Sequence, residues 1–225
     1  MVVKLLALDT SGELCSAALW LDGEAAWQDA PAGRRHSQLL LPMVDALLRQ
    51  AGLRPGDLDG IAFGSGPGSF TGLRIACGVA QGLAFSAGIP VLGVPTLMAL
   101  AEASAAARAL CCVDARMGEI YLAAYERRDR QWATVSEPAL YRPQTVPLPD
   151  GAGWVGVGSG FAAHRDALCE RYGAQLDRVD AAAVPHAREM ARLAAPGFAC
   201  GLGTAPDDAL PLYIRDKVAL RSDER

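Results

Sequence analysis

"GSGPGSFTGLRIACGVAQGLA", residues 64–84, begins as a glycine-rich loop and continues as a helix of small residues. The apolar run over residues 58–66, which leads into the loop, has the pattern of a buried strand. A loop between a strand and a helix often holds a phosphate, because free N–H groups and the positive end of the helix dipole face the ligand. Glycines also permit tight turns and close packing. We favour an architectural role for the stretch and keep a phosphate site as the alternative.

The loop lacks the residues that define three known phosphate-binding or hydrolase motifs. A Walker A loop needs a lysine beside the phosphates, whereas the only lysines of the chain are Lys4 and Lys217. The dinucleotide-binding pattern G-x-G-x-x-G requires a third glycine where this chain has Ser69 or Thr71. The serine-hydrolase pattern G-x-S-x-G fails at both Ser65 and Ser69. Backbone geometry is therefore the remaining basis for anion binding here.

The helix after the loop carries two glycines one turn apart, Gly78 and Gly82. Glycine inside a helix costs about 1 kcal/mol relative to alanine, so close packing of another helix is expected to offset it. The helix predicted over residues 37–50 is apolar beyond its main stripe, at Leu39, Leu41 and Ala46. Burial against the sheet explains part of this pattern, and the excess indicates a helix-to-helix protein interface. The residues expected at this interface are Leu39, Leu40, Met43, Val44, Leu47, Leu48, Gly72, Ala76, Gly78, Ala80 and Gly82.

Two acids, Asp9 and Asp114, end apolar runs that have the pattern of strands. A carboxylate in this position often approaches a ligand at the mouth of an α/β sheet. It equally often caps a nearby turn, so both interpretations stay open. The candidate nucleotide-binding residues are Asp9, Thr10, Ser11, Gly66, Gly68, Ser69 and Thr71.

The three histidines, His36, His164 and His186, lack the partners that a metal site requires. None of them has a His, Asp or Glu four residues away, and Leu40 stands at that spacing after His36. We therefore predict that none of them binds a metal, and we assign no catalytic residue.

The order of the predicted elements indicates an α/β fold with a mixed sheet. Three strands come first, and helices and strands then alternate. A second segment begins near residue 109 and repeats the theme of a strand, an acid and a second strand, which suggests a duplicated lobe. We predict an N-terminal lobe over residues 1–106 and a less regular C-terminal lobe over 107–225. Strands are predicted at 4–10, 14–21, 24–30, 58–66, 89–95, 110–116, 118–127 and within 153–160, and helices at 37–50, 71–87, 96–109 (with Thr96 as N-cap), 161–172 and 186–194.

Composition and charge restrict the class of protein further. The 225 residues are 51% hydrophobic and 20% charged, as in a soluble globular protein. The net charge of −4 argues against unaided binding of nucleic acid. The six cysteines include no C-x-x-C pair, and most of them sit among apolar neighbours, which predicts small core residues in a reducing cytoplasm. No apolar run approaches the roughly 20 residues that span a bilayer, and we find no secretory segment.

Five stretches together resemble a known bacterial family. They are "LALDTSGELCSAAL", "RRHSQLLLPMVDALL", "GSGPGSFTGLRIACGVAQGLA", "VDARMGEIYLAAY" and "LPLYIRD". They are similar to the TsaB family of threonylcarbamoyladenosine biosynthesis proteins, formerly grouped with the glycoprotease-like proteins. The resemblance covers nearly the whole chain. It implies an actin- and Hsp70-like (ASKHA) fold of two lobes, each with an RNase H-like mixed sheet flanked by helices.

The same resemblance implies a role in placing threonylcarbamoyl on the adenosine beside the anticodon of tRNAs that read codons starting with A. The catalytic relative, TsaD, carries an H-x-x-x-H metal motif, and the matching positions here are His36 and Leu40. A non-catalytic subunit that supports TsaD and works with the ATPase TsaE is therefore expected. The resemblance further implies a homodimer when the chain is alone, tRNA contact mainly through the complex, and no cofactor beyond ATP or ADP in that complex. The alternative is a nucleotide-binding or ATP-hydrolysing enzyme, whereas a metalloprotease is inconsistent with the histidine spacing.

Overall fold

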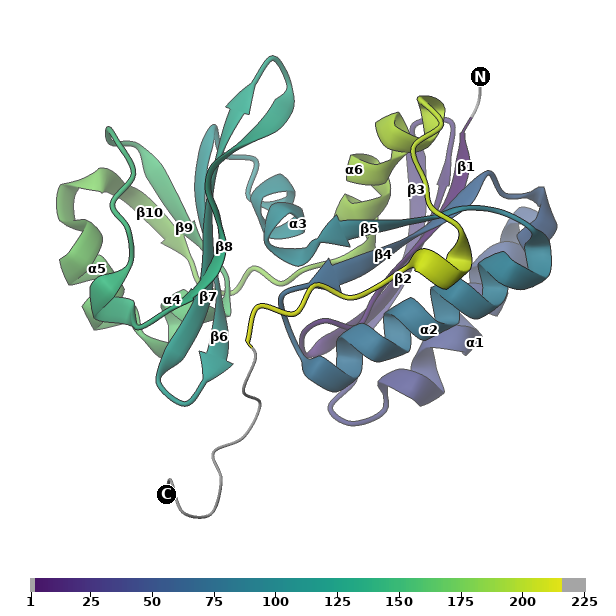
Figure 1. The fold of residues 1–225 in the computed structure, drawn as a ribbon, viewed down its shortest axis with the longest axis horizontal. Coiled ribbons are helices and arrows are strands. Elements are labelled where there is room, and N and C mark those ends of the chain that lie inside the picture. The colour runs from purple at the N-terminus through teal and green to yellow at the C-terminus, as the bar shows by residue number, and fades with distance from the viewer. Residues whose placement is uncertain (1–2, 216–225) are drawn as a thin grey trace.

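Two five-stranded sheets stand next to each other in the computed structural model, which describes residues 3–215 (Figure 1). The first sheet has the order β3-β2-β1-β4-β5, and the second has the order β10-β9-β6-β7-β8. The strands of the first are β1 (Lys4–Asp9), β2 (Leu14–Leu21), β3 (Glu24–Pro31), β4 (Gly60–Gly66) and β5 (Val91–Pro95). Those of the second are β6 (Arg108–Arg116), β7 (Glu119–Arg128), β8 (Gln131–Tyr141), β9 (Trp154–Val157) and β10 (Leu176–Asp180).

The second sheet repeats the topology of the first. In each sheet the first three strands of the segment pair antiparallel, as β1-β2-β3 and β6-β7-β8 do. The fourth strand then pairs parallel with the first, and the fifth pairs parallel with the fourth. The sequence suggested this repetition, because two predicted strands end in an acid. Asp9 and Asp114 therefore occupy equivalent positions in the two sheets.

Six α-helices cover the sheets within residues 3–215. Their bounds are α1 (His36–Ala51), α2 (Phe70–Ala87), α3 (Thr96–Ala103), α4 (Ser159–Ala163), α5 (Arg165–Tyr172) and α6 (Ala187–Ala199). Short 3-10 helices are η1 (Pro55–Asp57), η2 (Pro143–Thr145), η3 (Gly173–Gln175) and η4 (Pro206–Asp208). None of the helices in this range has the length and apolar character that a membrane crossing requires.

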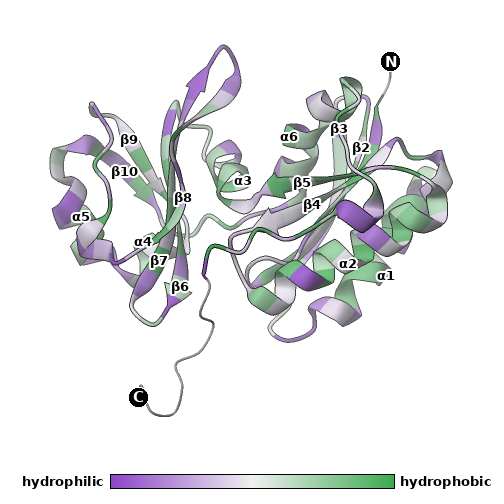
Figure 2. Cartoon of the chain, in the orientation of Figure 1, coloured by the Kyte–Doolittle hydropathy of each residue, from purple (hydrophilic) through white to green (hydrophobic). Residues whose placement is uncertain are grey.

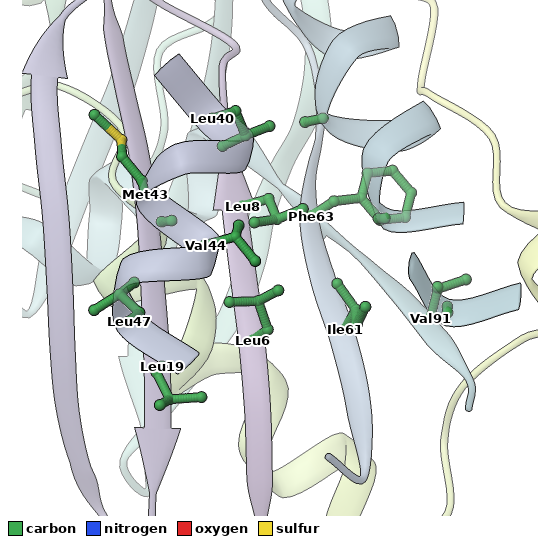
Figure 3. Packing of buried hydrophobic residues seen from close by; sticks show 14 of the residues in the cluster. Leu6, Leu8, Leu19, Leu40, Met43, Val44, Leu47, Ile61, Phe63 and Val91 are labelled. Atoms are coloured by element: carbon green, nitrogen blue, oxygen red, sulfur yellow. The ribbon is translucent and has the colours of Figure 1, made fainter. Parts of the chain in front are cut away.

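Helices α1 and α2 lie side by side on one face of the first sheet, where the largest core cluster forms (Figures 1 and 3). Figure 3 shows the apolar stripe of α1 pointing at the strands beneath it. This contact satisfies the helical pattern of the sequence, because residues three and four apart share one face of a helix. The side chains that meet there are Leu6, Leu8, Leu19, Leu40, Met43, Val44, Leu47, Ile61 and Phe63.

The last helix of each segment packs on the sheet of the other. Helix α3 follows β5 of the first sheet, yet Leu97 and Leu100 join the core of the second sheet with Tyr125. Helix α6 follows β10, yet Met190 and Phe198 join the core of the first sheet. Each core is therefore completed by the other half of the chain. The predicted lobe boundary between residues 106 and 107 stays a prediction. Helices α3 and α6 each come from one side of this boundary and pack on the sheet from the other side.

Several elements differ from the sequence prediction for identifiable reasons. Strand β8 was not predicted, because Pro138 and shifts in its register interrupt the alternation of an edge strand. Strand β10 is short and polar. Pro95, and not Thr96, holds the N-cap position of α3, because the Thr96 hydroxyl accepts a hydrogen bond from Gly66 N at 3.1 Å. Helix α3 ends at Ala103, six residues before the predicted bound at 109, because β6 begins at Arg108.

Prediction for the junction of the halves. The Glu102 carboxylate on α3 accepts hydrogen bonds from Arg127 of β7, from Trp132 Nε1 of β8 at 2.8 Å and from Arg192 of α6 at 3.3 Å. Removing a largely buried acid leaves these donors without their acceptor. We expect Glu102→Ala to lower the free energy of unfolding by about 3 kcal/mol, measured by urea denaturation.

The matched control is Asp45→Ala, which removes an exposed ion pair with Arg49 at 3.0 Å. Exposed pairs of this kind contribute little. Equal losses in the two variants would show that the Glu102 network does not hold the halves together.

Candidate functional site

The glycine loop between β4 and α2 packs directly on the turn that follows β1. Ser69 N donates a hydrogen bond to Ser11 O at 2.7 Å. The Thr10 hydroxyl donates to Gly72 O at 2.6 Å. Both bonds join backbone segments that lie about sixty residues apart in the sequence, so they fix the start of α2 over the end of β1.

Three glycines of the loop are required by this close approach. A Cβ atom on Gly72 would lie 1.8 Å from Thr10 O, and one on Gly68 would lie 2.5 Å from Ser11 O. A Cβ on Gly64 would lie 2.3 Å from a carboxylate oxygen of Asp9. Non-bonded atoms do not approach so closely. The packing therefore accounts for these glycines without a ligand, as the architectural interpretation expects.

The polar groups at the start of α2 are largely engaged within the chain. The Ser69 hydroxyl accepts from Gly72 N at 3.3 Å and caps the helix. The Ser69 amide is already donated to Ser11. A phosphate at this helix end would have to compete for these donors. The structure brings the candidate nucleotide-binding residues together around this loop, and their binding of a nucleotide stays a prediction.

Asp9 is fully buried, and one of its carboxylate oxygens has no partner. Oδ1 accepts from Ser11 N at 3.2 Å, while Oδ2 and the Ser11 hydroxyl have no hydrogen-bond partner within the described residues. Burial raises the pKa of Asp9 to about 7, although the hydrogen bond from the Ser11 amide opposes that shift. The carboxyl is therefore a group whose charge changes near neutral pH.

Asp114, the equivalent acid of the second sheet, has a different environment. It is partly exposed, and its Oδ1 accepts from Arg116 N at 2.9 Å. Its Oδ2 lies 3.2 Å from the Arg116 guanidinium. Asp9 and Asp114 thus each accept a hydrogen bond from the amide two residues further on, which is the turn-capping role that the sequence left open.

The histidines make local contacts. His36 Nε2 lies 3.1 Å from Gly12 O, and His186 Nδ1 accepts from Arg188 N at 3.0 Å as the cap of α6. His164 Nε2 lies 3.8 Å from an oxygen of Asp114. Over the part of the chain that the structure describes, no three His, Cys, Asp or Glu side chains are grouped so that they could hold a metal ion.

Most of the predicted interface residues are buried inside the chain itself, which corrects their assignment. The apolar stripe of α1 packs on the first sheet (Figure 3), and the small residues on the inner side of α2 belong to the same core cluster. Residues of which less than a tenth of the surface is exposed offer a second protein almost no contact area. The residues corrected in this way are Leu40, Met43, Val44, Leu47, Leu48, Gly72, Ala76 and Ala80.

The other predicted interface residues, Leu39, Gly78 and Gly82, are not in the buried core. Gly78 and Gly82 are exposed, and a Cβ atom on either would meet nothing within 4 Å. Leu39 on α1 is half-buried and packs against the edge of the core cluster. Figure 2 shows hydrophobic residues along much of α1 and α2. The bare glycine backbone is therefore an outward feature of α2.

Sequence reasoning missed two large residues of α2, Phe85 and Phe70, as interface candidates. Phe85 is 71% exposed and lies one turn beyond Gly82, so helical spacing from the two glycines could have found it. Phe70, at the start of α2, is 43% exposed. Leu41 on α1, which the sequence pattern placed outside the main stripe of its helix, is 48% exposed. We define the outer face of α2 as the exposed residues Phe70, Thr71, Arg74, Gly78, Gly82 and Phe85.

Comparison with known proteins gives consistent relatives. The family model for TsaD, tRNA N6-adenosine threonylcarbamoyltransferase, matches residues 30–220. The tRNA threonylcarbamoyladenosine biosynthesis protein TsaB of Escherichia coli (strain K12) is 40% identical over 96% of both chains. TsaB of Haemophilus influenzae is 35% identical over 96% of this chain and 95% of its own length.

Solved structures agree with these sequences. A Pseudomonas aeruginosa protein described as similar to the peptidase YeaZ has a TM-score of 0.88 at 40% identity, covering 95% of this chain and all of its own. Pseudomonas aeruginosa YeaZ has a TM-score of 0.87 at 41% identity, covering 94% and 99%. The predicted α/β class and actin- and Hsp70-like fold are confirmed, with two mixed sheets flanked by helices.

Prediction for Asp9. The folded chain keeps a proton on Asp9 up to about pH 7, whereas the unfolded chain loses it near the ordinary value of 3.8. The contribution of Asp9 to the free energy of unfolding is therefore fully present below pH 3.8. It is lost as the pH rises from 3.8 to 7, because only the unfolded chain gives up the proton in that range. Asp9→Asn does not ionise, so between pH 4 and pH 8 its free energy of unfolding should improve relative to wild type by up to about 4 kcal/mol.

Urea denaturation of both proteins at several pH values measures this difference. Parallel pH dependence of the two curves would contradict the raised pKa of Asp9.

Proposed function

The chain belongs to the TsaB family of tRNA threonylcarbamoyladenosine biosynthesis proteins, and we propose that it acts as a non-catalytic partner subunit in that modification. The complex places threonylcarbamoyl on the adenosine beside the anticodon of tRNAs that read codons starting with A. TsaD is its catalytic subunit and TsaE its ATPase. This chain supports TsaD in the cytoplasm and leaves most contact with tRNA to its partners, which agrees with a net charge of −4.

The first support for a non-catalytic role is the helix that would carry the metal motif. His36 begins α1, and its ring lies 3.1 Å from Gly12 O. Leu40 follows one turn later and is fully buried in the core beneath the helix. A leucine is no metal ligand, so this helix offers one histidine where the H-x-x-x-H motif has two. The same spacing argues against a peptidase that uses this helix.

The observation that carries the partner role is the bare backbone of α2. Gly78 and Gly82 are exposed in the interior of an 18-residue helix, with open space around them. Each costs about 1 kcal/mol relative to alanine, and no contact within the described chain requires either one. Close packing of a second helix against the backbone of α2 would explain why glycine stands at both positions.

The residues around these glycines fit such a helix. Leu39 and Leu41 lie on the neighbouring helix α1, and Phe85 extends the outer face of α2. A groove beside Phe85 continues the face, between the end of α2 and residues 203–206. We assign the outer face of α2, with Leu39 and Leu41, to a helix of TsaD.

The same face suits a homodimer when TsaD is absent. Two copies of α2 can cross antiparallel with the two-fold axis between Gly78 and Gly82. Gly78 of one copy then faces Gly82 of the other copy. Contacts of this isologous kind are usual in dimers.

The second candidate function is a nucleotide-binding or ATP-hydrolysing enzyme. The unpartnered Asp9 Oδ2 and Ser11 hydroxyl favour it, because both are buried beside the start of α2. Against it stand the engaged amide of Ser69 and the lack of lysine in the loop. We rank it second and propose that this chain itself requires neither a metal nor a cofactor, with ATP or ADP confined to the complex.

Prediction for the interface. Gly78→Glu should leave the fold intact, because the new side chain enters open space and replaces a poor helix former. It should weaken binding to TsaD at least tenfold, since the longer side chain blocks close helix packing. Size-exclusion chromatography and calorimetry with TsaD measure this, followed by tRNA modification with TsaD and TsaE.

Gly78→Ala introduces a smaller side chain at the same position. It should weaken binding to TsaD less than Gly78→Glu does. Ala162→Glu places the same charge on an exposed site of α4, away from α2, as the control. Unchanged complex formation and modification with Gly78→Glu would remove the interface assignment.

Prediction for nucleotide binding. Calorimetry of the isolated chain with ATP and with ADP should show no binding tighter than about 1 mM. The reason is that the Ser69 and Gly72 donors at the start of α2 are already used within the chain. Tight binding with turnover that disappears in Asp9→Ala would instead establish the enzyme as the function.

A further inference from the structure

The chain after α6 returns along the first sheet and then crosses toward the second (Figure 1). Thr204 forms a bridge with Val91 of β5, and η4 packs on α2. Residues 209–215 then run over the glycine loop toward the turn between β6 and β7, as the yellow segment of Figure 1 shows. We call residues 209–215 the C-terminal strap. None of its residues lies in a helix or strand.

The first half of the strap is anchored to the N-terminal half of the chain. Ala209 is buried, and its carbonyl accepts a hydrogen bond from Gln81 Nε2 at 3.1 Å and one from Cys77 Sγ at 3.5 Å. Leu212 N donates to Ser65 O in the glycine loop at 2.7 Å. The carbonyl of Leu212 lies so close to Gly66 that a Cβ atom there would be 2.9 Å away. The strap thus lies directly on the loop.

A stack of three side chains continues this anchor. The rings of Phe70 and Tyr213 have centroids 5.7 Å apart. The Arg74 guanidinium lies 3.4 Å from the Phe70 centroid and 5.1 Å from that of Tyr213. Such contacts between a cation and aromatic faces are attractive, so they hold the strap against the start of α2.

The far end of the strap is anchored to the second sheet. Arg215 forms an ion pair with Glu119 at the start of β7, and its guanidinium also contacts Met117 Sδ at 3.7 Å. The side chain of Arg215 is only 13% exposed, so this pair is better shielded than the ordinary surface pairs of the chain. The strap therefore spans from the glycine loop to the β6–β7 turn.

This turn is itself in an unfavourable backbone conformation. Arg116 and Met117 have φ angles of 62° and 58°, and Gly118 follows with 73°. Two successive residues in the left-handed region are the geometry of a type I′ hairpin turn, which favours Asn and Gly, whereas Arg and Met stand here. Contacts of the strap with Met117 and Glu119 lie at this turn, which also carries Asp114.

We propose that the C-terminal strap is a tether that fixes the β6–β7 turn relative to the glycine loop. Its inner anchors hold the loop that packs on Asp9, Thr10 and Ser11, and Arg215 holds the turn that follows Asp114. The strap thereby couples the two equivalent acid-bearing turns of the duplicated fold. The conformational order of the β6–β7 turn then depends on the contacts that residues 209–213 make with the glycine loop and α2.

Hydrogen exchange of the full chain, followed by mass spectrometry, tests this tether. Arg215→Ala should accelerate exchange at least about tenfold in peptides covering residues 114–120 and 209–213. Glu119→Gln, which keeps the size of the side chain but removes its charge, should do the same at both places. Arg54→Ala, which removes an exposed ion pair with Asp57, is the control and should leave both regions unchanged.

Tyr213→Ala separates a tether from local packing. Tyr213 contacts α2, so a local role would alter exchange only near the strap and the start of α2. A tether requires faster exchange in residues 114–120 as well, while β1 keeps its protection as proof that the chain stays folded. Wild-type exchange of residues 114–120 in either Arg215→Ala or Tyr213→Ala would overturn the proposal.

Discussion

The contact between the start of α2 and the end of β1 is the constraint on which the rest of the N-terminal half depends. Gly72 lies so close to Thr10 that no side chain fits between them, and two hydrogen bonds join the same segments. With its first turn fixed in this way, α2 presents one side to the core and the opposite side to solvent. The fixed first turn sets the rotation of α2 about its own axis. Because each residue advances about 100° around a helix, this rotation places Gly78 on the outer face.

The exchange of α3 and α6 makes a single unit from two similar sheets. Each helix leaves its own sheet and buries its apolar side against the other. The Glu102 carboxylate then joins α3, β8 and α6 through shared hydrogen bonds. Duplication explains why the two sheets have the same strand order, and the exchange explains why the halves are not independent. The strap adds a further connection on the side where the acid-bearing turns lie.

Equivalent positions in the two halves differ in chemistry because their burial differs. Asp9 and Asp114 make the same turn-capping bond, yet Asp9 is fully buried and one of its oxygens has no partner within the described residues. Desolvation disfavours its charged form, whereas Asp114 is accompanied by Arg116. The role that we propose for the chain depends on neither acid. It depends on the outer face of α2, where the glycines leave a surface without side chains.

The sequence by itself determined the strands and helices of the first half and the missing second histidine on α1, and it favoured an architectural use of the glycine loop. These follow from local patterns: periodicity, glycine spacing and the identity of one residue. Strands β8 and β10 could not be predicted, since their formation depends on pairing with neighbours and not on their own alternation. Only the tertiary structure decided which side of each helix is covered. It buried Leu40 and Ala80, exposed Gly78 and Phe85, and placed α6 and the strap on the first half. The physical reason is that burial depends on what packs against a residue, and those partners come from distant parts of the chain.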